Sequence, residues 1–490
     1  MPDATAVRRR QPKGLYVLFL TEMWERFGFY TMFSLLVLYL TQKVGLGDAD
    51  AALLYGTFAS FAYMTTLPGG FLADRLLGFR RAIIMGAAIM ALGYLSMLYS
   101  TPATITWSLA VLIVGNGLFK PNVGSLLGLL YDEDDPRRES GFTIFYLGIN
   151  TGAFAATLLA GWIGATYGYD IAFAIAGIGK VISLITFVIG QRWLDGKGHP
   201  PHPNLLEARH LGLISPTVLV LIGGAGVALV TAVLMRHDGL AGYLLAVIGL
   251  FAFGYLLFET FREEGETRRK LIAMIMLTAS SIVFWTVYNQ VGTSFVLFTE
   301  RLVDRELFSI TLPPSEFLSL NPLFILLMGG PFAALWVWLA KRGWNPSIPM
   351  KFVLGHVLIA AAFFSLVLAI FASSGKVPWE WLVLFFALYT AAEMVLSPVG
   401  LAMVTALAPK RLMGLSMGLW LLATSVSFYL AGLAAGIAAV PDKATDAQME
   451  SIYSTAFTDY GWIGLGGGLL LFALVPWLKR LMGHGTKETS

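Results

Sequence analysis

The sequence predicts an all-α, polytopic membrane protein. Of its 490 residues, 57% are hydrophobic and 13% are charged, whereas soluble proteins carry about 25% charged residues. Apolar runs of about 20 residues, the length that a spanning helix needs, recur along the whole chain. A transmembrane barrel would instead show alternating segments of about ten residues, and the sequence has no such pattern.

We expect fourteen spanning helices, one from each long apolar run. They cover residues 15–41, 51–74, 82–100, 104–130, 141–165, 170–190, 212–235, 239–259, 271–299, 317–340, 352–373, 379–408, 412–436 and 457–478. The first run is not a signal peptide, because it contains three charged residues and lacks a small-residue cleavage site. The longest polar insert, 191–211, is typical of a linker, and no segment is long enough to fold as a soluble domain.

The basic residues predict the orientation. They precede the first span and recur in every second gap, which places the N- and C-termini in the cytoplasm. We expect the protein in the cell (inner or plasma) membrane. These residues are Arg8, Arg9, Arg10, Lys13; Arg75, Arg80, Arg81; Arg137, Arg138; Arg192, Lys197, Arg209; Arg262, Arg268, Arg269, Lys270; Lys341, Arg342, Lys351; Lys410, Arg411; and Lys479, Arg480, Lys487. The other gaps are poor in basic residues, except that Arg301 and Arg305 lie among acids.

Composition also limits the chemistry. With no Cys, the chain has no thiolate metal site, no thiol nucleophile and no redox switch. It has six His in no ligand cluster and no HExxH motif, and its GxSxG match at 414–418 lies inside an apolar span and is no nucleophile elbow, so we expect neither a metal site nor an enzyme. A net charge of +3 is too small to argue for nucleic acid. We expect no cofactor, with protons as a coupling ion. We expect the lipid bilayer as a partner and no obligate protein partner.

Ionisable residues lie deep in several predicted spans. Each costs at least ~2.5–3.5 kcal/mol in a membrane, so such residues mark function by default. They are Glu22, Glu25, Arg26, Lys120, Lys180 and Glu393, whereas His356 lies nearer a cytoplasmic end. Three acids and three bases suit a zwitterionic solute, with acids left over for protons.

The first span concentrates three of these charges. Glu22, Glu25 and Arg26 are three and four residues apart, so they share one helical face that Tyr30 and Phe33 continue. Two acids and one Arg leave one negative charge unless a proton binds, which is the composition of a protonation switch. The alternative is an ion-pair network that only holds helices together.

Two of the other charges lie beside prolines. Lys120 precedes Pro121, which frees a backbone carbonyl as broken helices do beside a cavity. Lys120 is too far from either end of its span to snorkel easily. Glu393 lies five residues before Pro398, so we expect it too beside a cavity, with the opposite charge. For Lys180 we favour a helix-packing or snorkelled lysine.

Five segments resemble, in the family's order, motifs of the proton-dependent oligopeptide transporter family within the major facilitator superfamily. They are Glu22–Tyr30 (the ExxERFxYY motif), the superfamily loop Gly70–Arg81, the fourth-helix motif Gly115–Asn122, the fifth-helix signature Phe145–Gly152, and Ala392–Gly400, which includes Ser397 and Pro398. The resemblance implies two six-helix bundles, in domains 1–190 and 271–490. It also implies that two extra helices lie in the linking domain 191–270.

The resemblance also implies roles for individual residues. Arg26 and Lys120 would hold the peptide carboxylate, and Glu393 would pair with the peptide amino group, or with Lys120 in the empty site. Asn321 would also meet the amino end, and contacts to the rest of the peptide would come from Tyr30, Tyr63, Asn150, Ser397, Trp420 and Phe428. Proton coupling would fall on Glu22, Glu25 and Glu393, with Arg26 and Lys120. Each aromatic residue alone could equally be core packing.

Four positions depart from the family pattern. Phe29 replaces the first Tyr of the usual pair, and Phe33 stands where many members have an Arg. The usual acidic partner of that Arg aligns with Asn289, and the His of animal members aligns with Gly56. With Phe33 and Asn289 at these positions, we expect the external gate to close through apolar packing.

The predicted function is a proton-coupled symporter that imports di- and tripeptides by alternating access. An alternative is a transporter of another small solute, nitrate or an organic anion, on the same scaffold, although Glu393 would repel a simple anion. An integral membrane enzyme lacks any supporting motif. A sensor on this fold would typically append a soluble domain, and the sequence has none.

Overall fold

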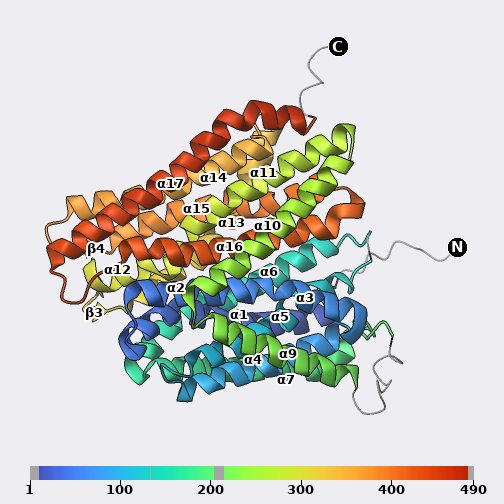
Figure 1. The fold of residues 1–490 in the computed structure, drawn as a ribbon, viewed down its shortest axis with the longest axis horizontal. Helices are drawn as coiled ribbons and strands as arrows, with labels where there is room; N and C mark the ends of the chain where they lie inside the picture. The colour runs from blue at the N-terminus through green and yellow to red at the C-terminus, as the bar shows by residue number, and fades with distance from the viewer. Residues whose placement is uncertain (1–9, 133, 203–214, 484–490) are drawn as a thin grey trace. The chain divides into compact units, whose positions relative to one another are not determined.

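The computed structural model describes residues 10–132, 134–202 and 215–483, and helices make up almost all of these ranges (Figure 1). The helices are α1 (Lys13–Tyr39), α2 (Asp48–Met64), α3 (Thr66–Leu72), α4 (Phe79–Ser96), α5 (Ile105–Gly128), α6 (Arg138–Tyr167), α7 (Tyr169–Gly190), α9 (Pro216–Leu234), α10 (Asp238–Arg262), α11 (Gly265–Tyr288), α12 (Ser294–Leu302), α13 (Leu320–Lys341), α14 (Ile348–Ala372), α15 (Glu380–Leu407), α16 (Met413–Ala435) and α17 (Asp446–Leu481). Arg8, Arg9, Arg209, Lys487, part of the linker 191–211 and the start of the span 212–235 lie outside the described residues.

The predicted all-α membrane class is confirmed. Among the described residues, 12 segments are long and apolar enough to cross a membrane. Two predicted spans fall outside that set for local reasons. Helix α1 carries several charged residues, and α2 is only 17 residues long.

Two predicted spans are interrupted. The span 51–74 consists of α2 and α3, which are separated at Thr65, and the span 271–299 is divided by a 3₁₀ turn at Asn289–Gly292. By contrast, α5 continues through Pro121 and α15 through Pro398. Because proline lacks an N–H, Pro121 frees the carbonyl of Gly117 four residues earlier. That carbonyl faces α3, where a Cβ at Gly69 would collide with it.

The few strands of the described chain are short and lie between helices. They are β1 (Val303–Asp304), β2 (Glu306–Leu307), β3 (Ile310–Thr311) and β4 (Val377–Pro378). Strand β1 pairs parallel with β4, and β2 pairs antiparallel with β3. These pairs order the loop after α12 and form no closed sheet.

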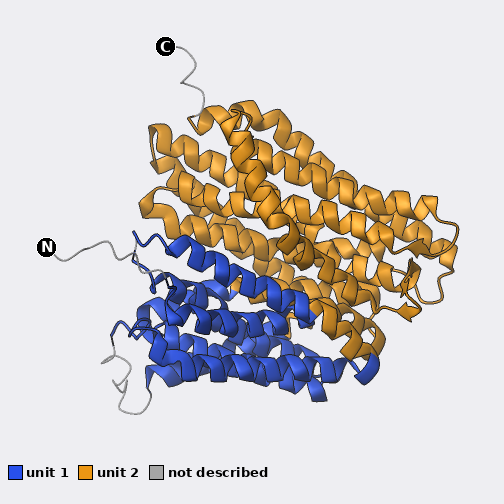
Figure 2. Ribbon diagram, turned by 180° about the vertical axis from the view of Figure 1, so that it is seen from behind, with its two compact units in different colours: residues 1–32, 65–156, 166–232 blue, residues 33–64, 157–165, 233–490 orange. Residues whose placement is uncertain are grey.

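Contacts group the chain into two compact units (Figure 2). Unit 1 comprises Met1–Met32, Thr65–Ala156 and Thr166–Ala232, and unit 2 comprises Phe33–Met64, Thr157–Ala165 and Val233–Ser490. Helices α1 and α6 therefore contribute to both units. The predicted domains 1–190, 191–270 and 271–490 stay a prediction. Below, each unit is described by itself.

Unit 1 is built around α4 and α5, with α3 on α5 and α7 on α4. Small residues allow close approach, as is common between membrane helices: a Cβ at Gly86 would lie 2.7 Å from the backbone nitrogen of Phe119. The loop before α4 is fixed to the segment after α7. The Nε of Arg80 donates to the carbonyl of Lys197 at 2.5 Å, and its backbone N–H donates to the carbonyl of Gly198 at 3.1 Å.

In unit 2, α14 packs against α15 and α17, and α2 runs along α16 (Figure 1). At Gly56 the backbones of α2 and α16 touch, since a Cβ there would lie 2.6 Å from the carbonyl oxygen of Phe428. The position that aligns with the His of animal members therefore has no room for a side chain. Helix α10 keeps apolar side chains exposed, as a lipid-facing helix would: Leu250 and Phe251 are 76% and 74% exposed.

Candidate functional site

The charged face of α1 forms a buried polar site in unit 1. The Nε of Arg26 donates to Glu25 at 2.5 Å and lies 3.4 Å from an oxygen of Glu22. The two carboxylates and the guanidinium are all buried, and Glu25 is 0% exposed. One oxygen of each carboxylate has no hydrogen-bond partner among the described residues. Arg26 thus bridges two acids without satisfying either one completely, which leaves acceptors for a proton.

Lys120 and Arg26 are brought together by the ring of Phe29. The guanidinium of Arg26 lies 4.7 Å from the ring centroid, and the ammonium of Lys120 lies 5.3 Å from it. A cation within about 6 Å of an aromatic face is attracted to it. Phe29, which departs from the family pattern by losing a hydroxyl, therefore presents an aromatic face to both cations. The two predicted carboxylate-binding residues lie in one site, contributed by α1 and α5.

Two further predicted residues belong to unit 1. Tyr30 is half-buried on α1, with its ring edge-to-face on Phe29 at a centroid distance of 5.6 Å. Asn150 is buried on α6 and donates to the carbonyl of Tyr146 at 2.9 Å. Helix α6 approaches α1 closely here, since a Cβ at Gly152 would lie 3.1 Å from the Cβ of Arg26. Asn150 lies two residues before this contact on the same helix.

The acidic site of unit 2 centres on Glu393 in α15. One carboxylate oxygen accepts hydrogen bonds from the hydroxyl of Tyr288 at 2.6 Å and from the amide of Asn321 at 3.0 Å. The same amide donates to Thr390 at 3.1 Å. The ring of Tyr288 stacks on Tyr389 at a centroid distance of 4.1 Å. Asn321 thus contacts Glu393, the residue to which the resemblance assigns the peptide amino group.

Sequence reasoning missed Tyr288. A single tyrosine within a predicted apolar span carries no specific signal, because an aromatic residue there can equally belong to the core. Its position immediately before Asn289, at the interruption between α11 and α12, is the feature that could have marked it.

The remaining predicted contacts are aromatic or hydroxyl groups of unit 2. Tyr63 stacks on Phe428 with ring centroids 5.1 Å apart. Trp420 is buried against Gly400, where a Cβ would collide with the indole. Ser397 is half-buried on α15, one helical turn after Glu393. The Lys120–Glu393 ion pair stays a prediction, since the two residues belong to different units.

The predicted external end of unit 2 contains the positions that depart from the gate pattern. Phe33 packs edge-to-face on Tyr55 with ring centroids 5.8 Å apart. Asn289 is buried, and its amide nitrogen has no hydrogen-bond partner among the described residues. The apolar contact expected at Phe33 is therefore present.

A charge pair that sequence reasoning missed lies at the same end. Arg301 of α12 donates to both oxygens of Asp48, at 2.5 and 2.8 Å, and also to the hydroxyl of Tyr453 at 3.2 Å. Asp48 also accepts the backbone N–H of Val440 at 3.0 Å. The apolar contact at Phe33 is thus accompanied by a charge pair at other positions of this end. The signal was Arg301 itself, one of two basic residues in an otherwise base-poor gap.

We predict that Asp48→Asn opens this end more often, because it leaves Arg301 with a weaker acceptor. The pair is partly exposed, so the expected cost is about 2 kcal/mol, between the values for exposed and buried pairs. Since the chain has no native Cys, a single Asn289→Cys reports the change through its rate of modification by a membrane-impermeant maleimide. Asp50→Asn, an exposed neighbour on α2, is the control. Equal labelling rates in the two variants would contradict a gating role.

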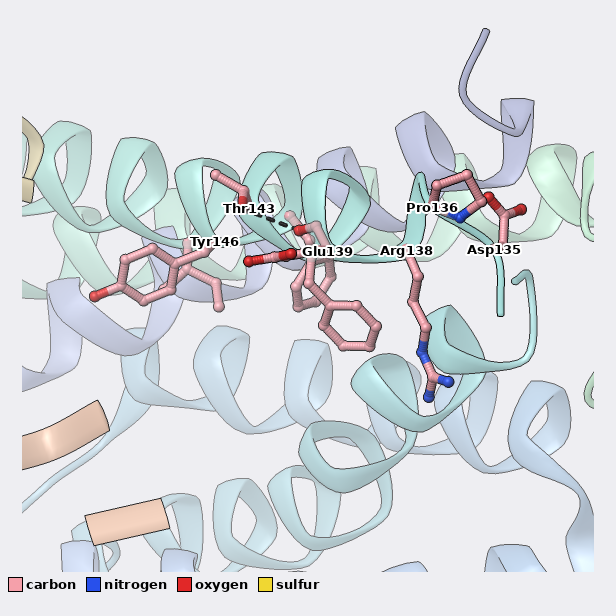
Figure 3. Close-up of a pocket in the computed structure, with 9 residues that line it drawn as sticks. Asp135, Pro136, Arg138, Glu139, Thr143 and Tyr146 are labelled. Atoms are coloured by element: carbon pink, nitrogen blue, oxygen red, sulfur yellow. Dashed lines mark hydrogen bonds between the residues drawn. The ribbon is translucent and has the colours of Figure 1, made fainter. Parts of the chain in front are cut away.

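The cavity at the start of α6 does not contain the candidate residues. It has a volume of about 850 Å³ and is lined by side chains that include Arg138, Glu139 and Tyr146 (Figure 3). Thr143 donates to the backbone carbonyl of Glu139 at 3.0 Å beside it. None of the predicted site residues lines this cavity, so it does not define the site.

The helices and the buried charges define a multi-pass membrane protein of the transporter class. The model of the POT family matches residues 80–463. Dipeptide and tripeptide permease A of Enterobacter sp. (strain 638) is 35% identical over 477 residues, which cover 96% of this chain and 93% of that protein. The permease of the same name from Escherichia coli (strain K12) is 34% identical over 480 residues, covering 96% and 94%.

Solved structures of peptide transporters also match this chain. Peptide transporter POT in complex with sulfate has a TM-score of 0.84 and 31% identity, over 97% of this chain and 98% of that one. A mutant of the same transporter in complex with alafosfalin gives the same values. This chain belongs to the POT family.

Proposed function

We propose that this protein is a proton-coupled symporter that takes di- and tripeptides into the cell by alternating access. The observation that carries the proposal is the division of charge between the two units, in which Arg26 is buried and Lys120 and Glu393 are half-buried. Arg26 and Lys120 lie on α1 and α5 in unit 1, and Glu393 lies on α15 in unit 2. A zwitterionic peptide needs cations for its carboxylate and an acid for its amine. The permease relatives transport, by their names, dipeptides and tripeptides.

Binding of the two peptide ends uses groups that are already arranged. Arg26 and Lys120 share the ring of Phe29, so two cations converge on one anion-binding position. Glu393 is oriented by Tyr288 and Asn321, which hold one carboxylate oxygen. The other oxygen is left to accept from an ammonium group. Charge-assisted hydrogen bonds of this kind are roughly twice as strong as neutral ones.

Coupling follows from competition for Arg26. While Glu22 and Glu25 are ionised, they hold the guanidinium. A proton on one carboxylate weakens that hold and releases Arg26 to the peptide, and loss of the proton inside reverses the step. Each proton that moves inward gains about 2.3 kcal/mol per 100 mV of membrane potential, enough for tens-fold accumulation.

The proposal includes the orientation and the partners. The N- and C-termini lie in the cytoplasm and the protein resides in the inner or plasma membrane, on the argument of loop charges. Protons are the coupling ion, no further cofactor or protein partner takes part, and the protein is a transporter rather than an enzyme. A nitrate or organic-anion transporter is not favoured, because Glu393 would repel a simple anion.

The test is uptake of labelled dialanine into proteoliposomes under an imposed proton gradient. We expect concentrative uptake that unlabelled di- and tripeptides inhibit and that nitrate leaves unchanged. Inhibition by nitrate together with no effect of peptides would overturn the proposal in favour of the anion transporter. Collapsing the gradient with a protonophore is the control for coupling.

A further inference from the structure

Lys180 is a buried charge that the proposed mechanism does not use. It lies on α7, is 0% exposed, and its ammonium has no hydrogen-bond partner among the described residues. The ammonium stands 3.2 Å from the ring centroid of Phe119, the residue before Lys120. A snorkelled lysine extends its ammonium to water, so the snorkelled interpretation of Lys180 is wrong. A fully buried, unpaired ammonium is costly and needs a compensating charge nearby.

That compensation lies on α1. The hydroxyl of Ser183 donates to the carbonyl of Thr21 at 2.7 Å, and a Cβ at Gly179 would lie 3.0 Å from the ring of Trp24. These two contacts place Lys180 on the part of α7 that faces the acids of α1. Thr21 and Trp24 directly precede Glu22 and Glu25 in the chain.

The other helices around this position contribute few polar groups. Helix α4 places Tyr94 beside α1, since a Cβ at Gly28 would lie 3.2 Å from its ring, and beside α7 at Gly177. Helix α5 contributes Phe119 and the cation of Lys120. The titratable and charged groups around Lys180 are thus Glu22, Glu25, Arg26, Tyr94 and Lys120.

We propose that Lys180 is a positioning residue of the proton-binding cluster, the second cation that balances the two acids of α1. This inference rests on the proposed proton-coupled function. With both acids ionised, Arg26 and Lys180 make the group of four residues on α1 and α7 neutral; Lys120, whose predicted partner in the empty site is Glu393, is not part of this group. Uptake of one proton by Glu22 or Glu25 then leaves one net positive charge, which the incoming peptide carboxylate neutralises. Loss of that proton restores neutrality and releases the peptide.

Removing Lys180 changes this balance in a definite direction. The deprotonated group would carry one unbalanced negative charge in a buried site, so a carboxylate would keep its proton and the cycle would stall at proton release. The steps that carry peptide across without net proton movement would continue. The expected defect is therefore in gradient-driven uptake and in its pH dependence, rather than in exchange.

The experiment compares Lys180→Met, which keeps the length of the side chain, with Lys180→Arg, which keeps the charge. In proteoliposomes, Lys180→Met should lose gradient-driven dialanine uptake and retain counterflow. The pH of half-maximal uptake should rise by about one unit or more, as expected when a cation near a carboxylate is lost. Lys180→Arg should retain part of the driven uptake. Lys376→Met, an exposed lysine in a loop, is the matched control.

The outcomes separate this inference from the function it rests on. If the wild type fails to concentrate dialanine, the proposed function falls. If the wild type succeeds and Lys180→Met keeps both its uptake and its pH midpoint, the inference about Lys180 is overturned. If Lys180→Met does not fold, folding and counterflow are measured in the charge-balanced variant Glu25→Gln/Lys180→Met instead. A folded double variant with counterflow supports charge compensation, and an unfolded one assigns Lys180 to packing and overturns the inference.

Discussion

Glu22→Gln and Glu25→Gln should each abolish concentration of dialanine against a gradient while leaving counterflow partly intact. Both carboxylates are buried against Arg26 and retain an oxygen without a hydrogen-bond partner among the described residues. A glutamine keeps the shape but cannot release a proton, so the proton gradient no longer does work on the peptide. The accumulation ratio should fall to about one, since the 2.3 kcal/mol per 100 mV carried by each proton is lost.

The measurement is the steady-state ratio of internal to external labelled dialanine in proteoliposomes, with counterflow measured on the same preparation. Glu264→Gln, an exposed glutamate before α11, is the matched control and should accumulate peptide as the wild type does. If both α1 variants still concentrated peptide, Glu22 and Glu25 would be structural and the protonation switch would have to lie elsewhere.

Glu393→Ala should weaken binding of peptides with a free amino group and have little effect on amino-blocked peptides. In the structure, the Glu393 carboxylate is held on one side by Tyr288 and Asn321. Loss of a hydrogen bond to a charged group costs about 1.5–3 kcal/mol, so the affinity for free peptides should fall by about 10- to 100-fold. Inhibition of labelled uptake by dialanine and by acetyl-dialanine measures the two affinities.

The wild type should prefer dialanine strongly, and Glu393→Ala should discriminate poorly between the two peptides. Glu380→Gln, an exposed acid at the start of the same helix, serves as the control. An equal loss of affinity for free and blocked peptides would mean that Glu393 supports the fold of the site and does not bind the amine. Lys120→Ala should in turn lose driven transport, because it removes one of the two cations at the Phe29 ring.

The features that could be predicted from the sequence depend on residues close together in the chain. Glu22, Glu25 and Arg26 share a face because helix geometry fixes residues three and four apart, and the structure places them together. The length of the apolar runs likewise predicted the all-α membrane class. The interruptions at Thr65 and at Asn289–Gly292 were not predicted, because apolar residues flank each position within one predicted span.

What could not be predicted depended on which helices are neighbours. Position along α7 could not show that Lys180 faces the ring of Phe119 rather than water. The Asp48–Arg301 pair joins residues that are 253 positions apart in the chain. Tyr288 can donate to Glu393 only because α11 lies beside α15. A single sequence contains no information about these pairings beyond the motifs that it resembles.

The central claim is that peptide and proton enter together, and internal acidification tests it most directly. Proteoliposomes loaded with a pH-sensitive dye are held at a negative internal potential, and dialanine is added outside. We expect peptide-dependent acidification in the wild type, and none in Glu25→Gln under conditions where counterflow continues. Peptide uptake without acidification in the wild type, or equal acidification in Glu25→Gln, would contradict the account.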